Sequence, residues 1–192
     1  MSGTKYVLAF DPGKSSGVAL ASYSENEPFD LVDVWQFGNG VQGLLDWIEE
    51  NLVQENWLVP AYVKVNDFGA PLGRTTIVCE KFVPRSALTL DGSVPLVGEG
   101  VLIGRGLMPP YDPQIDTWQA PARQYSAFGG KDLADKKKTA RRRLKDLGWY
   151  RMPKELGTPD SDDAMSATLH ALSYVLHTVK HRPTFDLISG DV

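Results

Sequence analysis

The sequence predicts a single α/β domain in which a mixed five-stranded sheet is covered by helices on both faces. Two observations predict it. Short segments rich in strand-forming residues end at Gly or Pro turns, and longer segments carry apolar residues at helical spacing. Their order is three strands, a helix, a strand, a helix, a strand and then further helices. The length, 192 residues, suits one domain over residues 1–192.

The first three expected strands form a meander. The apolar run KYVLAF ends at Asp11-Pro12-Gly13, and a tight turn over 13–17 would return the chain antiparallel to it. Apolar and polar residues alternate in the third strand before Gly38-Asn39-Gly40 breaks it. The five expected strands are 5–10, 18–23, 31–37, 75–82 and 115–118.

Helices are expected where apolar residues recur every three or four positions. The clearest stripe lies in the last helix and consists of Met165, Leu169, Leu172, Leu176 and Val179. A second stripe, in the basic helix before it, consists of Leu133, Ala140, Leu144 and Leu147. The expected helices are 41–52, 94–107, 120–128, 131–147 and 160–178. Residues 54–74, with two prolines and two glycines, are interpreted as a loop or hairpin insertion.

Composition narrows the classes of function. The single cysteine, Cys79, cannot form an internal disulfide, and no apolar run reaches the length of a membrane span. The first residues lack the pattern of a secretory signal. These features predict a cytoplasmic protein with no membrane partner.

Charge is distributed unevenly along the chain. The formal net charge is -4, yet residues 131–145 contain eight Lys or Arg and only two Asp, a local charge of +6. The segment predicts a basic surface on an acidic body and so a nucleic-acid partner. A solvated helix face is the alternative interpretation.

Acidic residues occur at three places in the predicted fold: a strand end, a second strand and the start of the last helix. Asp11 follows the first strand, Glu80 lies in the apolar strand 75–82, and Asp160 and Asp163 open the last helix three positions apart. Each has a simpler explanation: a turn-forming Asp-Pro-Gly, an exposed edge strand, and a capped helix terminus. Together they predict a site of hard oxygen ligands, which select Mg²⁺ or Mn²⁺. Two such ions about 3.5–4 Å apart can support phosphoryl displacement.

These motifs resemble the RuvC family of the RNase H-like superfamily. The matching strings are Ala9-Phe10-Asp11-Pro12-Gly13 with the later Gly17, then Ile77-Val78-Cys79-Glu80, then Asp160-Ser161-Asp162-Asp163-Ala164. The resemblance covers most of the chain, with 54–74 as an insertion, and is closer to phage-encoded members. It implies an RNase H-like fold and, for a phage protein, the host cytoplasm.

The resemblance also implies a role for individual residues. Metal ligation and catalysis fall to Asp11, Glu80, Asp160 and Asp163, with Asp162 ranked below Asp160. The implied enzyme is a crossover junction endodeoxyribonuclease that resolves Holliday junctions, as a homodimer, with two Mg²⁺ or Mn²⁺ ions. Residues expected to contact DNA are Lys14, Lys131, Lys136, Lys137, Lys138, Arg141 and Arg142.

Three other functions remain open at this stage. The same chemistry could serve flaps, forks or RNA–DNA hybrids. An actin- or sugar-kinase-like phosphotransferase also begins with Asp-x-Gly, but it needs a second phosphate-binding Gly motif. A junction-binding protein without nuclease activity is the third. His170 lies two turns beyond Asp163 and is interpreted as a core histidine rather than a member of the site.

Overall fold

The structure is a computed structural model. It describes residues 3–51, 75–82, 93–105, 107, 117–151 and 162–190. The predicted insertion at 54–74 lies outside these residues.

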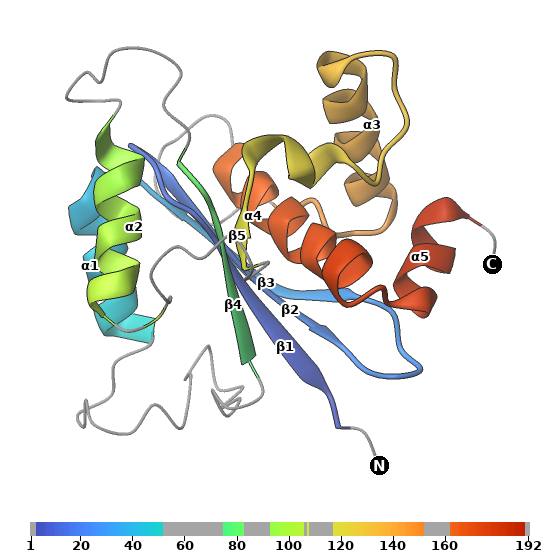
Figure 1. Ribbon diagram of the computed structural model, residues 1–192, viewed down its shortest axis with the longest axis horizontal. Coiled ribbons are helices and arrows are strands. Elements are labelled where there is room, and N and C mark those ends of the chain that lie inside the picture. Colours follow the sequence, from blue (N-terminus) through green and yellow to red (C-terminus); the bar gives the residue numbers. More distant parts are fainter. Residues whose placement is uncertain are drawn as a thin grey trace.

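A mixed five-stranded sheet forms the centre of the molecule (Figure 1). Its strands run in the order β3-β2-β1-β4-β5, with β1, β2 and β3 antiparallel and β4 and β5 parallel to β1. The tight turn pairs Asp11 with Gly17, as the sequence predicted. The strands are β1 (Lys5–Asp11), β2 (Ser16–Tyr23), β3 (Asp30–Phe37), β4 (Thr75–Glu80) and β5 (Trp118–Gln119).

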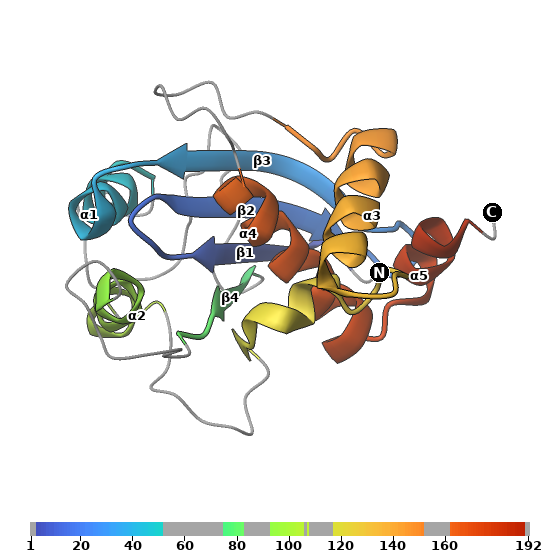
Figure 2. The same ribbon diagram turned by 90° about the horizontal axis from the view of Figure 1, so that it is seen from above.

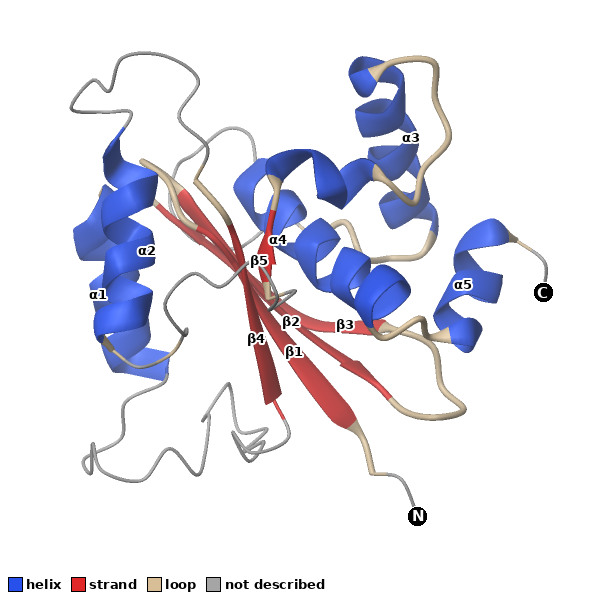
Figure 3. Ribbon diagram, in the orientation of Figure 1, coloured by secondary structure: helices blue, strands red, loops and turns tan. Residues whose placement is uncertain are grey.

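Helices lie on both sides of this sheet, so the predicted fold class is confirmed (Figures 2 and 3). One side carries α1 (Gly40–Asn51) and α2 (Val94–Gly104). The other carries a short 3-10 helix, η3 (Pro121–Tyr125), and the helices that follow it. These are α3 (Leu133–Asp146), α4 (Asp162–Ser173), its π-helical continuation η4 (Tyr174–Thr178) and α5 (Arg182–Ser189). No helix among the described residues is both long and apolar enough to cross a bilayer.

The central strands are apolar on both faces because each face meets a helical layer. In β1, Val7 and Ala9 join the core under α4, whereas Leu8 and Phe10 join the core under α1 and α2. The stripe predicted in the last helix is confirmed from Met165 to Leu176, all of it buried.

Some elements differ from the predictions. The fifth strand was expected at 115–118 but comprises only Trp118 and Gln119. Leu133, expected on the apolar side of its helix, is 58% exposed, because it is the first residue of α3 and projects beyond the core. The sequence did not predict α5, whose start is fixed by buried His181. The His181 ring contacts Thr184 Oγ1 and the Ser24 carbonyl, both at 2.7 Å.

Candidate metal centre

Two of the predicted carboxylates end neighbouring strands. Asp11 is the last residue of β1 and Glu80 the last residue of β4. The strands are parallel and pair Phe10 with Cys79, which places Asp11 beside Glu80. Alternation along each strand turns both side chains to the face covered by α4, because Val7, Ala9 and Val78 belong to that core.

The third carboxylate comes from the amino end of α4, which lies directly on β2. An added Cβ at Gly17 would stand 2.0 Å from the carbonyl oxygen of Asp163 and 2.6 Å from the nitrogen of Ala164. Only glycine permits this approach. Buried Gln36 of β3 also holds the helix end, since its Oε1 accepts the Ala164 N–H at 3.2 Å. The fold thus brings Asp163 to the ends of β1 and β4.

Burial and the neighbouring carboxylates both affect the pKa of Asp11. Burial, then the negative charges of Glu80 and Asp163, raise the pKa of Asp11 well above its ordinary value. The Ser166 hydroxyl, one turn along α4, favours the charged form and offsets part of the rise. The neighbouring negative charges thus disfavour the ionised form of Asp11.

Asp163 is subject to the same effects. Burial raises its pKa, and the charges of Asp162 and Glu80 raise it further, against the opposing effects of the Ser15 hydroxyl and of Lys137. The buried Ser15 Oγ does not reach full hydrogen-bond geometry with any partner. A divalent cation would relieve this accumulation of negative charge, and the donor set contains the carboxylate oxygens that Mg²⁺ and Mn²⁺ prefer.

The carboxylates do not stand in a finished coordination shell. Within the described part of the chain, no three His, Cys, Asp or Glu side chains are positioned to hold a metal ion. Asp160, the fourth predicted ligand, lies outside the described residues. The chemistry of the three side chains thus fits a divalent ion.

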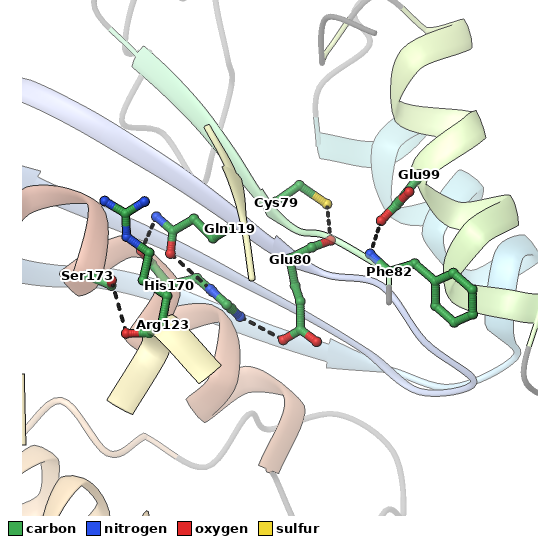
Figure 4. Close-up of polar contacts among 8 residues, drawn as sticks. All are labelled: Cys79, Glu80, Phe82, Glu99, Gln119, Arg123, His170 and Ser173. Carbon is green, nitrogen blue, oxygen red and sulfur yellow. Dashed lines mark hydrogen bonds and ion pairs between the residues drawn. The ribbon is translucent and has the colours of Figure 1, made fainter. Parts of the chain in front are cut away.

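Glu80 has a partner that sequence reasoning set aside. His170 of α4 is fully buried, and its Nε2 lies 2.7 Å from Glu80 Oε2 (Figure 4). Its Nδ1 lies 3.0 Å from Oε1 of Gln119, the last residue of β5. The spacing of 163, 166 and 170 on one helix face was the available signal. No pattern in the sequence predicted the contact between Gln119 and His170.

Asp162 has a different environment from its neighbour. It forms ion pairs with Lys137, at 2.9 Å, and with Arg141, both one turn apart on α3. Burial alone would raise the pKa of Asp162, but the hydrogen bonds and charges of Lys137 and Arg141 outweigh it and lower the pKa. Asp162 therefore joins α4 to the basic helix instead of facing the carboxylates.

The remaining basic residues predicted to contact DNA lie at the surface. Lys138 and Arg142 are exposed on α3, Lys131 is exposed just before it, and Lys136 is half-buried. Lys14 is exposed in the turn that follows Asp11. The basic helix thus contacts the start of α4 through Asp162, and the turn places a basic residue three positions after Asp11.

Among the comparisons with known proteins, a solved structure supports the fold. No protein-family model and no curated protein matches the chain. Among solved structures, the chain is similar to T. thermophilus RuvC in complex with a Holliday junction substrate, with a TM-score of 0.50 and 16% identity. The match covers 92% of this chain and 96% of the other. The chain therefore has a RuvC-like fold.

Proposed function

We propose that this chain is a metal-dependent endonuclease that hydrolyses phosphodiester bonds in branched DNA, with four-way junctions as its substrate. The proposal is carried by the position of three carboxylates at one end of the sheet: Asp11 and Glu80 end paired strands, and Asp163 packs on Gly17, the strand partner of Asp11. The RuvC-like fold supports it, since the similar structure was solved with a Holliday junction. Such a protein would act in DNA recombination and repair.

The three carboxylates, with Asp160, would hold two Mg²⁺ or Mn²⁺ ions. When bound, the ions supply an activated water and stabilise the leaving oxygen. Asp11 and Glu80 stand on strands of a buried sheet and are fixed in direction, whereas Asp163 is fixed by the packing of α4 on Gly17. Because Asp162 is engaged by α3, we assign the fourth position to Asp160.

DNA would contact the basic helix on the same side of the sheet as the carboxylates. Lys131, Lys136, Lys138 and Arg142 offer charges for phosphates, and Lys14 lies beside Asp11. Lys137 and Arg141 add positive charge near the reacting strand while holding Asp162. Such contacts give affinity that depends on salt but little on sequence.

A four-way junction presents two equivalent strands, so we propose a homodimer in which each subunit cuts one strand. Sedimentation at micromolar concentration tests this state. A monomer that nicks only one strand of each junction would contradict it.

The deciding experiment is a cleavage assay on a labelled four-way junction with Mg²⁺ or Mn²⁺. Asp11→Asn should abolish nicking while junction binding in Ca²⁺ persists, since the variant removes a metal ligand and leaves the basic helix intact. Absence of nicking on every branched substrate would reject the function. Unchanged nicking by Asp11→Asn would remove Asp11 from the mechanism.

Parallel substrates separate this function from the others that the sequence left open. Comparable rates on flaps, forks or RNA–DNA hybrids would indicate a broader nuclease. ATP turnover without nicking would indicate a phosphotransferase. Junction binding without nicking by the wild-type chain would indicate a structural junction-binding protein.

A further inference from the structure

The fully buried His170 has a defined hydrogen-bonding pattern. Gln119 Nε2 donates to the carbonyl oxygen of His170 at 3.2 Å, which fixes the orientation of the amide. The amide oxygen must then face the ring, where it lies 3.0 Å from Nδ1. Since that oxygen can only accept, Nδ1 must carry a hydrogen. The last residue of β5 therefore sets the orientation and the donor pattern of the imidazole.

The other ring nitrogen is directed at Glu80. Nε2 and Oε2 are 2.7 Å apart, so one hydrogen lies between them. Among the described residues, the second carboxylate oxygen, Oε1, accepts no hydrogen bond. Figure 4 shows the imidazole between the Gln119 amide and this carboxylate. One oxygen of Glu80 is thus held while the other is left for a cation.

We propose that His170 is a positioning residue, oriented by Gln119, that holds Oε2 of Glu80 so that Oε1 is directed at the bound metal. This inference rests on the proposed function and names residues that its ligand set does not include. A glutamate side chain has several rotatable bonds, and fixing it before the metal binds removes that entropic cost from binding. Outer partners of metal ligands typically contribute 10–100-fold to metal affinity or activity.

The alternative is that His170 has only a structural role, as a buried polar residue whose hydrogen bonds are satisfied. His181 offers the matched case, because it is also buried and both of its ring nitrogens have partners. Its partners are Thr184 and Ser24, remote in the fold from the ends of β1 and β4. A purely structural histidine should therefore behave in metal binding as His181 does.

Amide variants at 170 separate the two nitrogens. In His170→Gln the amide nitrogen replaces Nε2 and can still donate to Glu80, whereas in His170→Asn it replaces Nδ1 and reaches only Gln119. Gln119→Leu leaves the ring but removes the residue that orients it. His181→Gln serves as the control. Mn²⁺ binding to the DNA-free full chain is measured by calorimetry, and thermal unfolding in EDTA reports the stability of each variant.

We expect His170→Asn to weaken Mn²⁺ binding about 10–100-fold, Gln119→Leu to weaken it less, and His170→Gln to remain within a few-fold of wild type. His181→Gln should bind normally. In wild-type protein, Mg²⁺ should shift the ¹⁵N signal of His170 Nε2 and leave that of His181 unchanged. If His170→Asn fails to fold, the Gln119→Leu result and these ¹⁵N signals decide.

Two results would overturn the inference, and they are distinguishable. Wild-type affinity in a folded His170→Asn or in Gln119→Leu, with wild-type protein binding Mn²⁺, would reject the positioning role and leave the metal site intact. Absence of Mn²⁺ binding by the wild-type chain would reject the metal site itself and this inference with it.

Discussion

Adjacent carboxylates at the amino end of α4 have opposite electrostatic environments. Asp163 lies with Asp11 and Glu80, and burial among like charges raises its pKa. Asp162 lies against Lys137 and Arg141, which lower its pKa despite burial. The charge of Asp162 is balanced by ion pairs within the chain. The charge of Asp163 lies instead among other carboxylates. The difference is consistent with the proposed cation site beside Asp163 and with the absence of such a role for Asp162.

Replacing each of the two adjacent aspartates with asparagine is the strongest test of this contrast. Asp163→Asn should lower the cleavage rate by about 10²–10³-fold or more, because it removes a proposed ligand of the metal ions that would stabilise charge in the transition state. Asp162→Asn should leave the rate within a few-fold and cost at most about 1 kcal/mol, since its ion pairs are partly exposed. Single-turnover rates and unfolding midpoints measure both. If Asp162→Asn were inactive and Asp160→Asn active, Asp162 would replace Asp160 as the proposed fourth ligand.

The close contact at Gly17 is expected to have the next largest effect. In Gly17→Ala the new methyl group would meet the backbone of Asp163, so α4 must move away from β2. Overpacking of this kind costs about 1–3 kcal/mol, and cleavage should fall because Asp163 moves with the helix.

Gly100→Ala is the matched control for Gly17→Ala. Its added Cβ meets nothing within 4 Å, and it lies in helix α2. The change should stabilise the protein by about 0.4–1 kcal/mol. Denaturant unfolding compares the two variants, and equal stability would mean that the contact at Gly17 does not constrain α4.

The two environments should also respond oppositely to pH in metal-free protein. A raised pKa means that Asp11 and Asp163 favour the folded state fully only below their ordinary pKa of 3.8, and that this contribution is lost as pH rises through the raised value. Asp162, with its lowered pKa, contributes above 3.8 and loses its contribution as pH falls through the lowered value.

Asp11→Asn isolates one of these contributions. The variant should be more stable than wild type at neutral pH in EDTA, and the difference should shrink as pH falls through the raised pKa of the wild-type carboxyl towards the ordinary value of 3.8. Added Mg²⁺ should stabilise wild type and leave the variant nearly unchanged. Melting temperatures from pH 4 to 8 provide the measurement. A pH-independent difference would contradict the raised pKa.

The smallest expected effect concerns the exposed residues of the basic helix. Lys138→Ala and Arg142→Ala should each weaken junction binding for all sequences alike. Each should also reduce the salt slope by about 0.9 for every phosphate that the variant no longer neutralises. Binding titrations at several salt concentrations measure the slope. Unchanged slopes would place the DNA elsewhere on the protein.

Local patterns in the sequence were enough to predict the fold class and the three acidic motifs. Alternation, helical stripes and the Asp11–Gly17 turn depend on neighbouring residues alone, and local physics is sufficient to read them. The same patterns missed α5, whose buried start depends on contacts with Ser24, more than 150 residues earlier in the chain.

The division of the acidic residues, in contrast, depends on the packing of distant elements. Asp162 and Asp163 are adjacent and chemically identical, and no spacing rule distinguishes the one paired with α3 from the one packed on Gly17. His170 likewise had no visible partner until β4 and β5 brought Glu80 and Gln119 to either side of it. Electrostatic environment depends on distance in space, and sequence order does not contain it.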